Sequence, residues 1–135
     1  MALAPSRCTF CMSHWDEETT RVFPNGAKLT RAEVIQSYTG DMSGEGTVEY
    51  LMAYTPGSPV KFVGLELLTG TIGGRSGSVV IQHDGIFNGN TAHSSWFFVD
   101  GSGTDQLISL HGSGSYDSVD QQRVNSSFIY TFGEG

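Results

Sequence analysis

The chain has 135 residues, a formal net charge of -7 and 18 glycines. That length suits one domain with a continuous core, so we expect a single domain over residues 1–135. Nucleic acids and anionic membranes are bound through clustered Lys and Arg, so the acidic charge and scattered basic residues argue against both as partners. No apolar run approaches the roughly 20 residues of a membrane span, and no leader is evident, which predicts a cytoplasmic protein.

The first expected strand carries both cysteines, Cys8 and Cys11, with His14 three residues further on. A C-x-x-C pair can bind zinc or perform redox chemistry, but a zinc site needs a second pair of ligands and a redox site needs a following helix. Neither accompanies this motif. Because residues three apart in a strand face opposite sides, we expect two reduced thiols that do not meet.

Short segments rich in β-branched and aromatic residues recur along the chain with turn residues between them, which is typical of an all-β sandwich or barrel. A helix is compatible only with residues 16–20, and weakly. Short turns predict an antiparallel meander, and eight strands can close into an up-and-down barrel that holds one small ligand; an open sandwich is the alternative. The expected strands cover residues 8–15, 28–39, 46–55, 60–72, 77–87, 90–99, 107–116 and 124–132.

Two glutamates stand in the middle of otherwise apolar segments, Glu49 in VEYLMAY and Glu66 in VGLELL. Paired residues of an antiparallel hairpin are fixed by the centre of its turn. A turn centred on Gly57-Ser58 would set Glu49 directly opposite Glu66, with their Cβ atoms about 5 Å apart. Two charges at that distance repel by about 3 kcal/mol at an effective dielectric of about 20, so the pair must share a proton or find a cation.

The next two turns connect these glutamates to a histidine. The Asn-Gly dipeptide at residues 88–89 is preferred in two-residue type I′ turns and would pair His83 with Ser94. A two-residue turn within residues 73–75 has two possible registers, and both place Glu66 on the same face as His83. A three-residue turn there would point the histidine outward.

The sequence therefore predicts one inward row of ionisable groups, Glu49, Glu66 and His83, in an apolar pocket. Such a row can hold both an acid and a base, so proton transfer is the chemistry that fits. A register slip of one residue would turn both glutamates to solvent. The same row could bind iron or manganese, but its spacing matches no familiar motif, and we predict no metal or cofactor. The residues predicted to line the pocket are Phe62, Ile81, Ser94, Trp96, Phe98 and Tyr130.

Several segments resemble a known family: TVEYLMAY, FVGLELLTGTIGGRSGSVVIQH, GSGTDQLISLHGSGSY, and the TF and WDE of residues 9–17. They are similar to an uncharacterised bacterial and fungal family, a domain of unknown function placed among the allene oxide cyclase-like barrels. The resemblance is close from Lys28 to Tyr116 and implies an eight-stranded antiparallel barrel, often oligomeric, with a pocket at one mouth. Cyclases and dirigent proteins of that superfamily hold a reactive substrate in one conformation. No catalytic residues are established for the uncharacterised family, so none is carried over.

These observations predict a small-molecule-binding barrel that acts as a cofactor-independent cyclase, isomerase or lyase on a hydrophobic, oxygenated metabolite of secondary metabolism. Glu49, Glu66 and His83 would move the protons. One alternative is a carrier barrel that binds its ligand without chemistry. Another is a homo-oligomeric interaction protein, which is suggested by an apolar outer face of Val63, Leu65 and Leu67 alongside Tyr50 and Met52.

Overall fold

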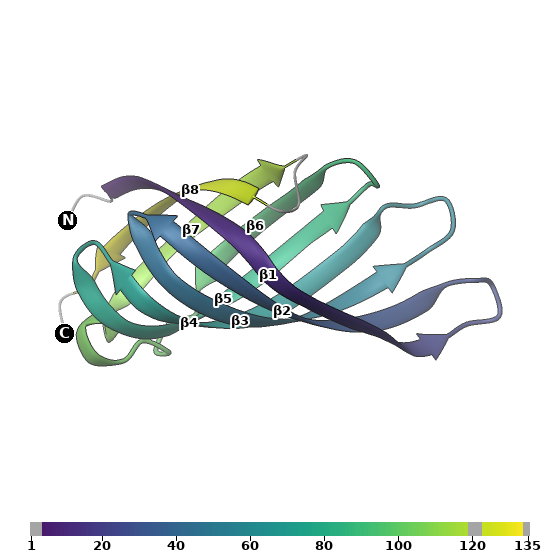
Figure 1. The fold of residues 1–135 in the computed structure, drawn as a ribbon, viewed down its shortest axis with the longest axis horizontal. Coiled ribbons are helices and arrows are strands. Elements are labelled where there is room, and N and C mark those ends of the chain that lie inside the picture. Colours follow the sequence, from purple (N-terminus) through teal and green to yellow (C-terminus); the bar gives the residue numbers. More distant parts are fainter. Residues whose placement is uncertain (1–3, 119–122, 134–135) are drawn as a thin grey trace.

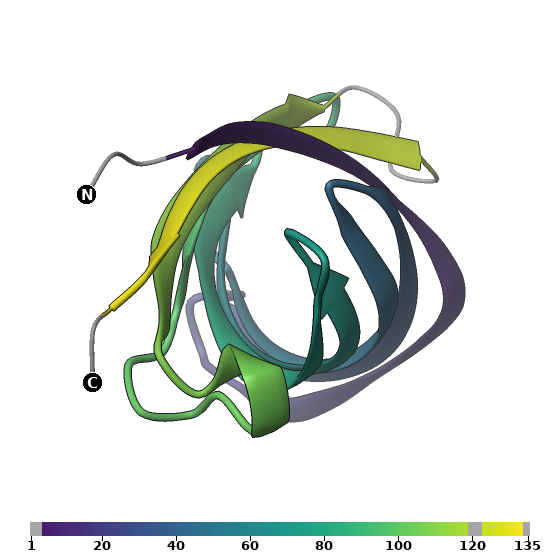
Figure 2. The same ribbon diagram turned by 90° about the vertical axis from the view of Figure 1, so that its left-hand side faces the viewer.

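The computed structural model describes residues 4–118 and 123–133. Each strand pairs antiparallel with the next, and β1 also pairs with β8, so the sheet closes into the expected barrel (Figure 1). Figure 2 shows this ring from the end that carries both termini, with β1 and β8 side by side. The elements are β1 (Ala4–Val22), β2 (Lys28–Gly40), β3 (Met42–Tyr54), β4 (Val60–Ile72), β5 (Arg75–Phe87), β6 (Ala92–Phe98), η1 (Asp105–Leu107), β7 (Leu110–Ser118) and β8 (Arg123–Phe132).

Two local expectations are wrong. Residues 16–20, weakly compatible with a helix, belong to the long strand β1. The single turn η1 was not expected; it begins at Asp105, whose φ is 53°. Leu107 of this turn is completely buried, so its apolar side chain explains why the segment folds back onto the barrel before β7 begins. In the part of the chain that the structure describes, no helix is long and apolar enough to cross a membrane.

A β-bulge in β1 decides which of its side chains reach the barrel interior. The pairing of β1 with β2 shifts by one residue between Met12 and His14. Before the bulge the even-numbered residues of β1 face inward, and after it the odd-numbered ones do. Trp15 and Glu17 consequently lie on the inner face, where each pairs with a completely buried residue of β2.

The register of β3 with β4 differs by one residue from the expected one. Glu66 pairs with Val48, and Glu49 pairs with Leu65. The prediction that the two glutamates face each other is therefore wrong: Glu66 is completely buried inside the barrel, whereas Glu49 is exposed on its outer face. The turn is centred on Gly57, whose φ is 77°, so it contains an odd number of residues instead of an even one. A one-residue slip thus separates the glutamates; it does not turn both to solvent.

The hairpin of β4 and β5 follows one of the two expected registers. Its turn is Gly73-Gly74, with φ values of 58° and 82° that suit glycine. Glu66 pairs with Ile81, and His83 pairs with Gly64. Glu66 and His83 therefore share the inner face as diagonal neighbours, as predicted.

The two-residue turn expected at residues 88–89 does not form. The side chain of Asn88 accepts hydrogen bonds from the backbone N–H groups of Asn90 and Thr91, which stabilises a longer connection. The register moves by two residues, so His83 pairs with Trp96 and not with Ser94. A shift of two keeps every side chain on its face, which is why the inward row of β6 is still predicted correctly.

Two apolar clusters fill the barrel with a polar layer between them. Gln36, Glu66 and His83 form this layer, and each is completely or almost completely buried. The first cluster, nearer the termini, includes Phe10, Tyr38, Leu68, Ile81, Trp96 and Phe98. The second, nearer the turns that follow β1, β3 and β5, consists of Ala32, Val34, Val48, Tyr50, Met52 and Phe62.

Candidate functional site

A cavity of about 510 Å³ opens at the end of the barrel opposite the termini. This end, on the right in Figure 1, carries the turns that follow β1, β3 and β5. The volume suits a small organic molecule. The cavity walls are mainly aromatic and include Trp15, Tyr50, Tyr54, Phe62, Phe87 and Tyr116.

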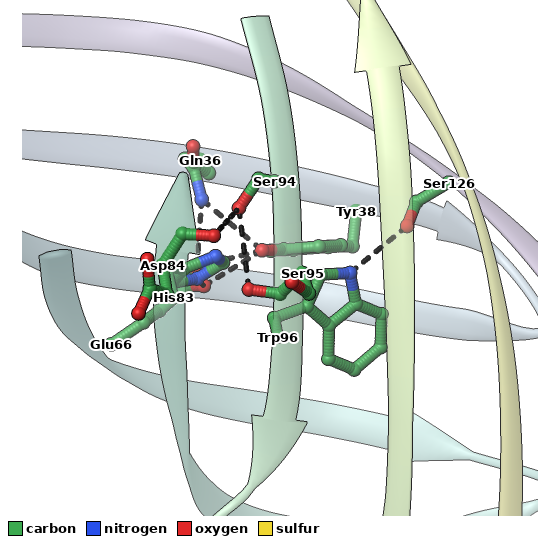
Figure 3. A network of polar contacts seen from close by, with 9 residues as sticks. All are labelled: Gln36, Tyr38, Glu66, His83, Asp84, Ser94, Ser95, Trp96 and Ser126. Atoms are coloured by element: carbon green, nitrogen blue, oxygen red, sulfur yellow. Dashed lines mark hydrogen bonds and ion pairs between the residues drawn. The ribbon is translucent and has the colours of Figure 1, made fainter. Parts of the chain in front are cut away.

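A buried polar network lies beneath this cavity and centres on the carboxylate of Glu66 (Figure 3). The Tyr38 hydroxyl donates to both carboxylate oxygens, at 2.8 and 3.0 Å, and the Gln36 amide donates to Oε2 at 3.0 Å. His83 Nε2 lies 2.6 Å from Oε1. Each of the three partners can supply a hydrogen, so the carboxylate acts as an acceptor on both oxygens.

Three buried polar atoms of the described residues have no hydrogen-bond partner: Gln36 Oε1, His83 Nδ1 and the Tyr50 hydroxyl. Leaving such a group unpaired costs about 1–3 kcal/mol, so unpaired groups in native proteins often have a functional reason. Because Nε2 of His83 contacts Glu66, Nδ1 is the ring nitrogen without a partner. Two of these atoms belong to the polar layer, and the third, the Tyr50 hydroxyl, belongs to a residue of the cavity wall.

Tyr50 joins the polar layer to the cavity. It lines the cavity, and its ring centroid lies 5.7 Å from that of His83 and 5.5 Å from that of Phe62. Burial, with smaller effects of Tyr116 and Glu66, raises the pKa of Tyr50 well above its usual value. Burial also raises the pKa of Tyr116 to about 12. Both hydroxyls therefore stay protonated at neutral pH and can donate to an oxygen of a ligand.

Glu17 places a second carboxylate at the cavity, nearer its mouth. The Thr30 and Tyr54 hydroxyls each donate to Oε2 at 2.6 Å, and Trp15 Nε1 donates to Oε1 at 3.1 Å. Partial burial acts to raise the pKa of Glu17, but these hydrogen bonds and the charge of Lys28 outweigh it and lower the pKa. The carboxylate is therefore ionised at neutral pH.

The structure brings together only part of the predicted site. Glu66 and His83 are in contact, as expected, but Glu49 lies outside the barrel and away from them. Phe62 lines the cavity as predicted. The other residues predicted to line it lie elsewhere, in the core or toward the opposite end: Ile81, Ser94, Trp96, Phe98 and Tyr130.

Several cavity residues were not predicted from the sequence, for two reasons. Trp15 and Glu17 face inward because of the bulge in β1, and no turn residue in the sequence indicates that bulge. Tyr50 and Met52 were expected on the outer face, which is wrong: the turn after β3 is centred half a residue earlier than expected, so both face inward, as does Tyr54. A pattern of alternating aromatic residues in EYLMAY was the available signal, since Tyr50, Met52 and Tyr54 share one face.

The two cysteines lie on opposite faces of β1, as expected from their spacing: Cys8 is buried and Cys11 is exposed. Burial, then the negative charges of Glu66 and Asp41, raise the pKa of Cys8 to about 12.

The thiolate is the reactive form, so Cys8 should not react with a disulfide reagent in the folded protein at pH 8. A dithionitrobenzoate assay should detect one rapidly reacting thiol per chain, and Cys11→Ser should abolish that reaction. Fast reaction of two thiols in the native protein would contradict this placement.

Comparison with known proteins gives a family and a fold. The model of a family described as proteins of unknown function, DUF3224, matches residues 6–130. A crystal structure of a protein of unknown function from the DUF3224 family, from Shewanella oneidensis MR-1, superposes with a TM-score of 0.78 at 22% sequence identity, covering 99% of this chain and 100% of that one. No curated protein matches the chain. At this identity the likeness supports the barrel fold and carries no residue roles.

Proposed function

The chain belongs to the DUF3224 family of proteins of unknown function, and we propose that it binds a small, mainly apolar molecule in the mouth of its barrel. The observation that carries this proposal is the aromatic cavity of about 510 Å³ with the unpartnered hydroxyl of Tyr50 in its wall. Aromatic walls favour an apolar ligand because each Å² of apolar surface removed from water contributes roughly 25 cal/mol. The hydroxyls of Tyr50 and Tyr116 favour a ligand that carries an oxygen at its inner end.

Methionine methyl groups allow binding to be observed at the site itself. Met12 and Met52 line the cavity, whereas Met42 is completely buried in the first apolar cluster. Addition of 3-phenylpropan-1-ol to protein labelled with ¹³C at its methionine methyls should shift the signals of Met12 and Met52 and leave that of Met42 unchanged. Absence of any shift at the first two, or equal shifts at all three, would count against a ligand in this cavity.

Tyr50→Phe separates the role of this hydroxyl in binding from a role in stability. The hydroxyl makes no hydrogen bond of ordinary geometry, although it interacts with the Tyr116 hydroxyl, so its removal should change the free energy of unfolding by less than about 1 kcal/mol. Affinity for 3-phenylpropan-1-ol should fall about threefold to tenfold if the hydroxyl bonds the ligand. Tyr38→Phe is the matched control: it removes a hydroxyl bonded to Glu66 and should destabilise the fold. Equal effects of the two variants on stability would contradict this distinction.

The contact of Glu66 with His83 favours a second candidate, a cofactor-independent isomerase or cyclase that works by proton transfer. In such a pair the carboxylate orients the imidazole and stabilises its cation, while the other ring nitrogen takes the proton. That nitrogen, Nδ1 of His83, is unpartnered, and Tyr50 packs between the histidine and the cavity. Because neither this nitrogen nor the Tyr50 hydroxyl has a hydrogen-bond partner, the two do not bond each other, and a polar group of the ligand would have to reach Nδ1 past the Tyr50 ring.

The catalytic candidate predicts that His83→Ala and Glu66→Gln each lower the turnover of an identified substrate by about a hundredfold or more. Glu49→Gln, outside the barrel, should leave turnover unchanged. A ligand recovered unaltered after long incubation would leave binding as the function. The expected cytoplasmic location, homo-oligomer and role in secondary metabolism stay predictions.

A further inference from the structure

The carboxylate of Glu17 is held in a fixed position at the edge of the cavity. Its hydrogen bonds come from Thr30, Tyr54 and Trp15, and the last two of these also line the cavity. A carboxylate offers about four acceptor positions, so about one is left for a further donor. Glu17 itself lines the cavity, and a donor inside it can approach that position.

Aromatic rings surround this carboxylate, and aromatic rings can contribute to cation binding. The rings of Trp15 and Tyr50 are nearly parallel, with an interplanar angle of 28° and centroids 6.3 Å apart. Cations bind over aromatic faces within about 6 Å of the ring centroid. Tyr54 already has such a contact, because the ammonium of Lys28 lies 4.8 Å from its ring centroid. Lys28 is exposed and does not itself line the cavity.

Glu17 is the carboxylate that lines the cavity, and Lys28 is the nearby exposed cation that acts on it. Among the residues that the structure describes, Glu17 lines the cavity and no Lys or Arg does; His14 is the remaining basic group in the lining. Burial, with a smaller effect of Glu66 beneath the floor, raises the pKa of both Tyr50 and Tyr116. A concave site with negative charge and apolar walls concentrates cations.

We propose that the ligand is an organic cation whose ammonium group lies beside the Glu17 carboxylate, next to Trp15 and Tyr54, while its apolar part extends inward along Phe62. This assignment rests on the proposed binding function and adds the chemical class of the ligand. A primary amine would use the free acceptor position of Glu17 directly. A quaternary ammonium would use the aromatic faces and the carboxylate charge.

Three probes of matched length test the charge of the ligand: 3-phenylpropylammonium, 3-phenylpropan-1-ol and 3-phenylpropanoate. Their affinities are measured by calorimetry at pH 7, and the Met12 and Met52 methyl signals report that each binds in the cavity. The ammonium should bind about tenfold or more tightly than the alcohol, because hydrogen bonds to charged groups are the stronger ones. The carboxylate should bind more weakly than the alcohol.

Two isosteric variants test whether the preference for the ammonium probe depends on the Glu17 carboxylate. Glu17→Gln should weaken binding of the ammonium about tenfold and change that of the alcohol by less than about twofold. Glu18→Gln is the matched control, since it removes the same charge one residue away from an exposed side chain that pairs with Arg31. It should change neither affinity. Retained binding of the alcohol shows that each variant is folded.

The possible results separate the two proposals. If the alcohol and the carboxylate bind as tightly as the ammonium while the Met12 and Met52 signals shift, the cation assignment is overturned and the binding function stands. Equal loss of ammonium affinity in Glu17→Gln and Glu18→Gln would also overturn it. If none of the three probes shifts these signals, both proposals fail.

Discussion

Replacement of Glu66 by alanine should lower the free energy of unfolding by about 3–5 kcal/mol, the cost of removing one partner from a buried, hydrogen-bonded pair. The carboxylate is completely buried and accepts hydrogens from Gln36, Tyr38 and His83. Alanine leaves those donors facing a void in the barrel. No water can compensate for them without entering the layer between the two apolar clusters, so the loss should exceed that of an ordinary core truncation to a small residue.

Urea unfolding followed by tryptophan fluorescence measures this loss, because Trp96 is buried in the first cluster. The m-value should be unchanged if the variant alters stability and not compactness. Glu49→Ala is the control: the same substitution on the adjacent strand, at an exposed position, should change stability by less than about 0.5 kcal/mol. Similar losses in both variants would contradict the inward placement of Glu66 and the outward placement of Glu49.

Most of the fold could be predicted from local patterns in the sequence. Alternating apolar residues locate the strands, and glycine-rich turns separate them, so seven strands were expected within four residues of their observed bounds; β1 (Ala4–Val22) is much longer than the expected 8–15. Closure into a barrel came from the resemblance to an uncharacterised family, because composition alone left an open sandwich possible. The family match and the paired edges of β1 and β8 bear out that expectation.

Registers were harder to predict, because a register depends on how many residues the turn contains. Glycine and proline locate the turn between β3 and β4 but do not decide whether its centre is Gly57 or lies between two residues. That difference of half a residue moved Glu49 from the inside to the outside. The error at Asn88 was harmless, since its side chain stabilises a longer turn and shifts the register by two residues.

The site depends on features that sequence patterns do not encode. The pairing of Glu66 with His83 needed only that both face inward, which the even-numbered turn at Gly73-Gly74 ensures. Trp15 and Glu17 needed the bulge, and a bulge is selected by packing across strands. Sequence reasoning therefore found Glu66 and His83 of the polar layer but not Gln36, and only Phe62 of the cavity above it.

The buried carboxylate also explains a glycine in β3. A Cβ atom at Gly46 would lie 1.9 Å from Oε2 of Glu66 and 2.7 Å from its Cδ, so the carboxylate occupies the space that a side chain at this position would fill. Glu66 cannot move aside easily, because Gln36, Tyr38 and His83 hold both of its oxygens. Gly46→Ala should therefore destabilise the barrel by about 3 kcal/mol, at the upper end for overpacking.

The effect of Gly46→Ala on the free energy of unfolding should change sign when Glu66 is replaced by alanine. The three atoms nearest to a Cβ at Gly46 all belong to Glu66, and its backbone is not in the left-handed region. In the Glu66→Ala background, Gly46→Ala should thus be neutral or stabilise by about 0.4–1 kcal/mol, because alanine restricts the unfolded chain. Urea unfolding of the unchanged protein, the two single variants and the double variant should give a coupling energy of about 3 kcal/mol between the two substitutions. Trimethylamine N-oxide is added to all four samples if the double variant is too unstable to measure without it. Additive losses would mean that the carboxylate does not lie over Gly46, and the polar layer would then need a different geometry.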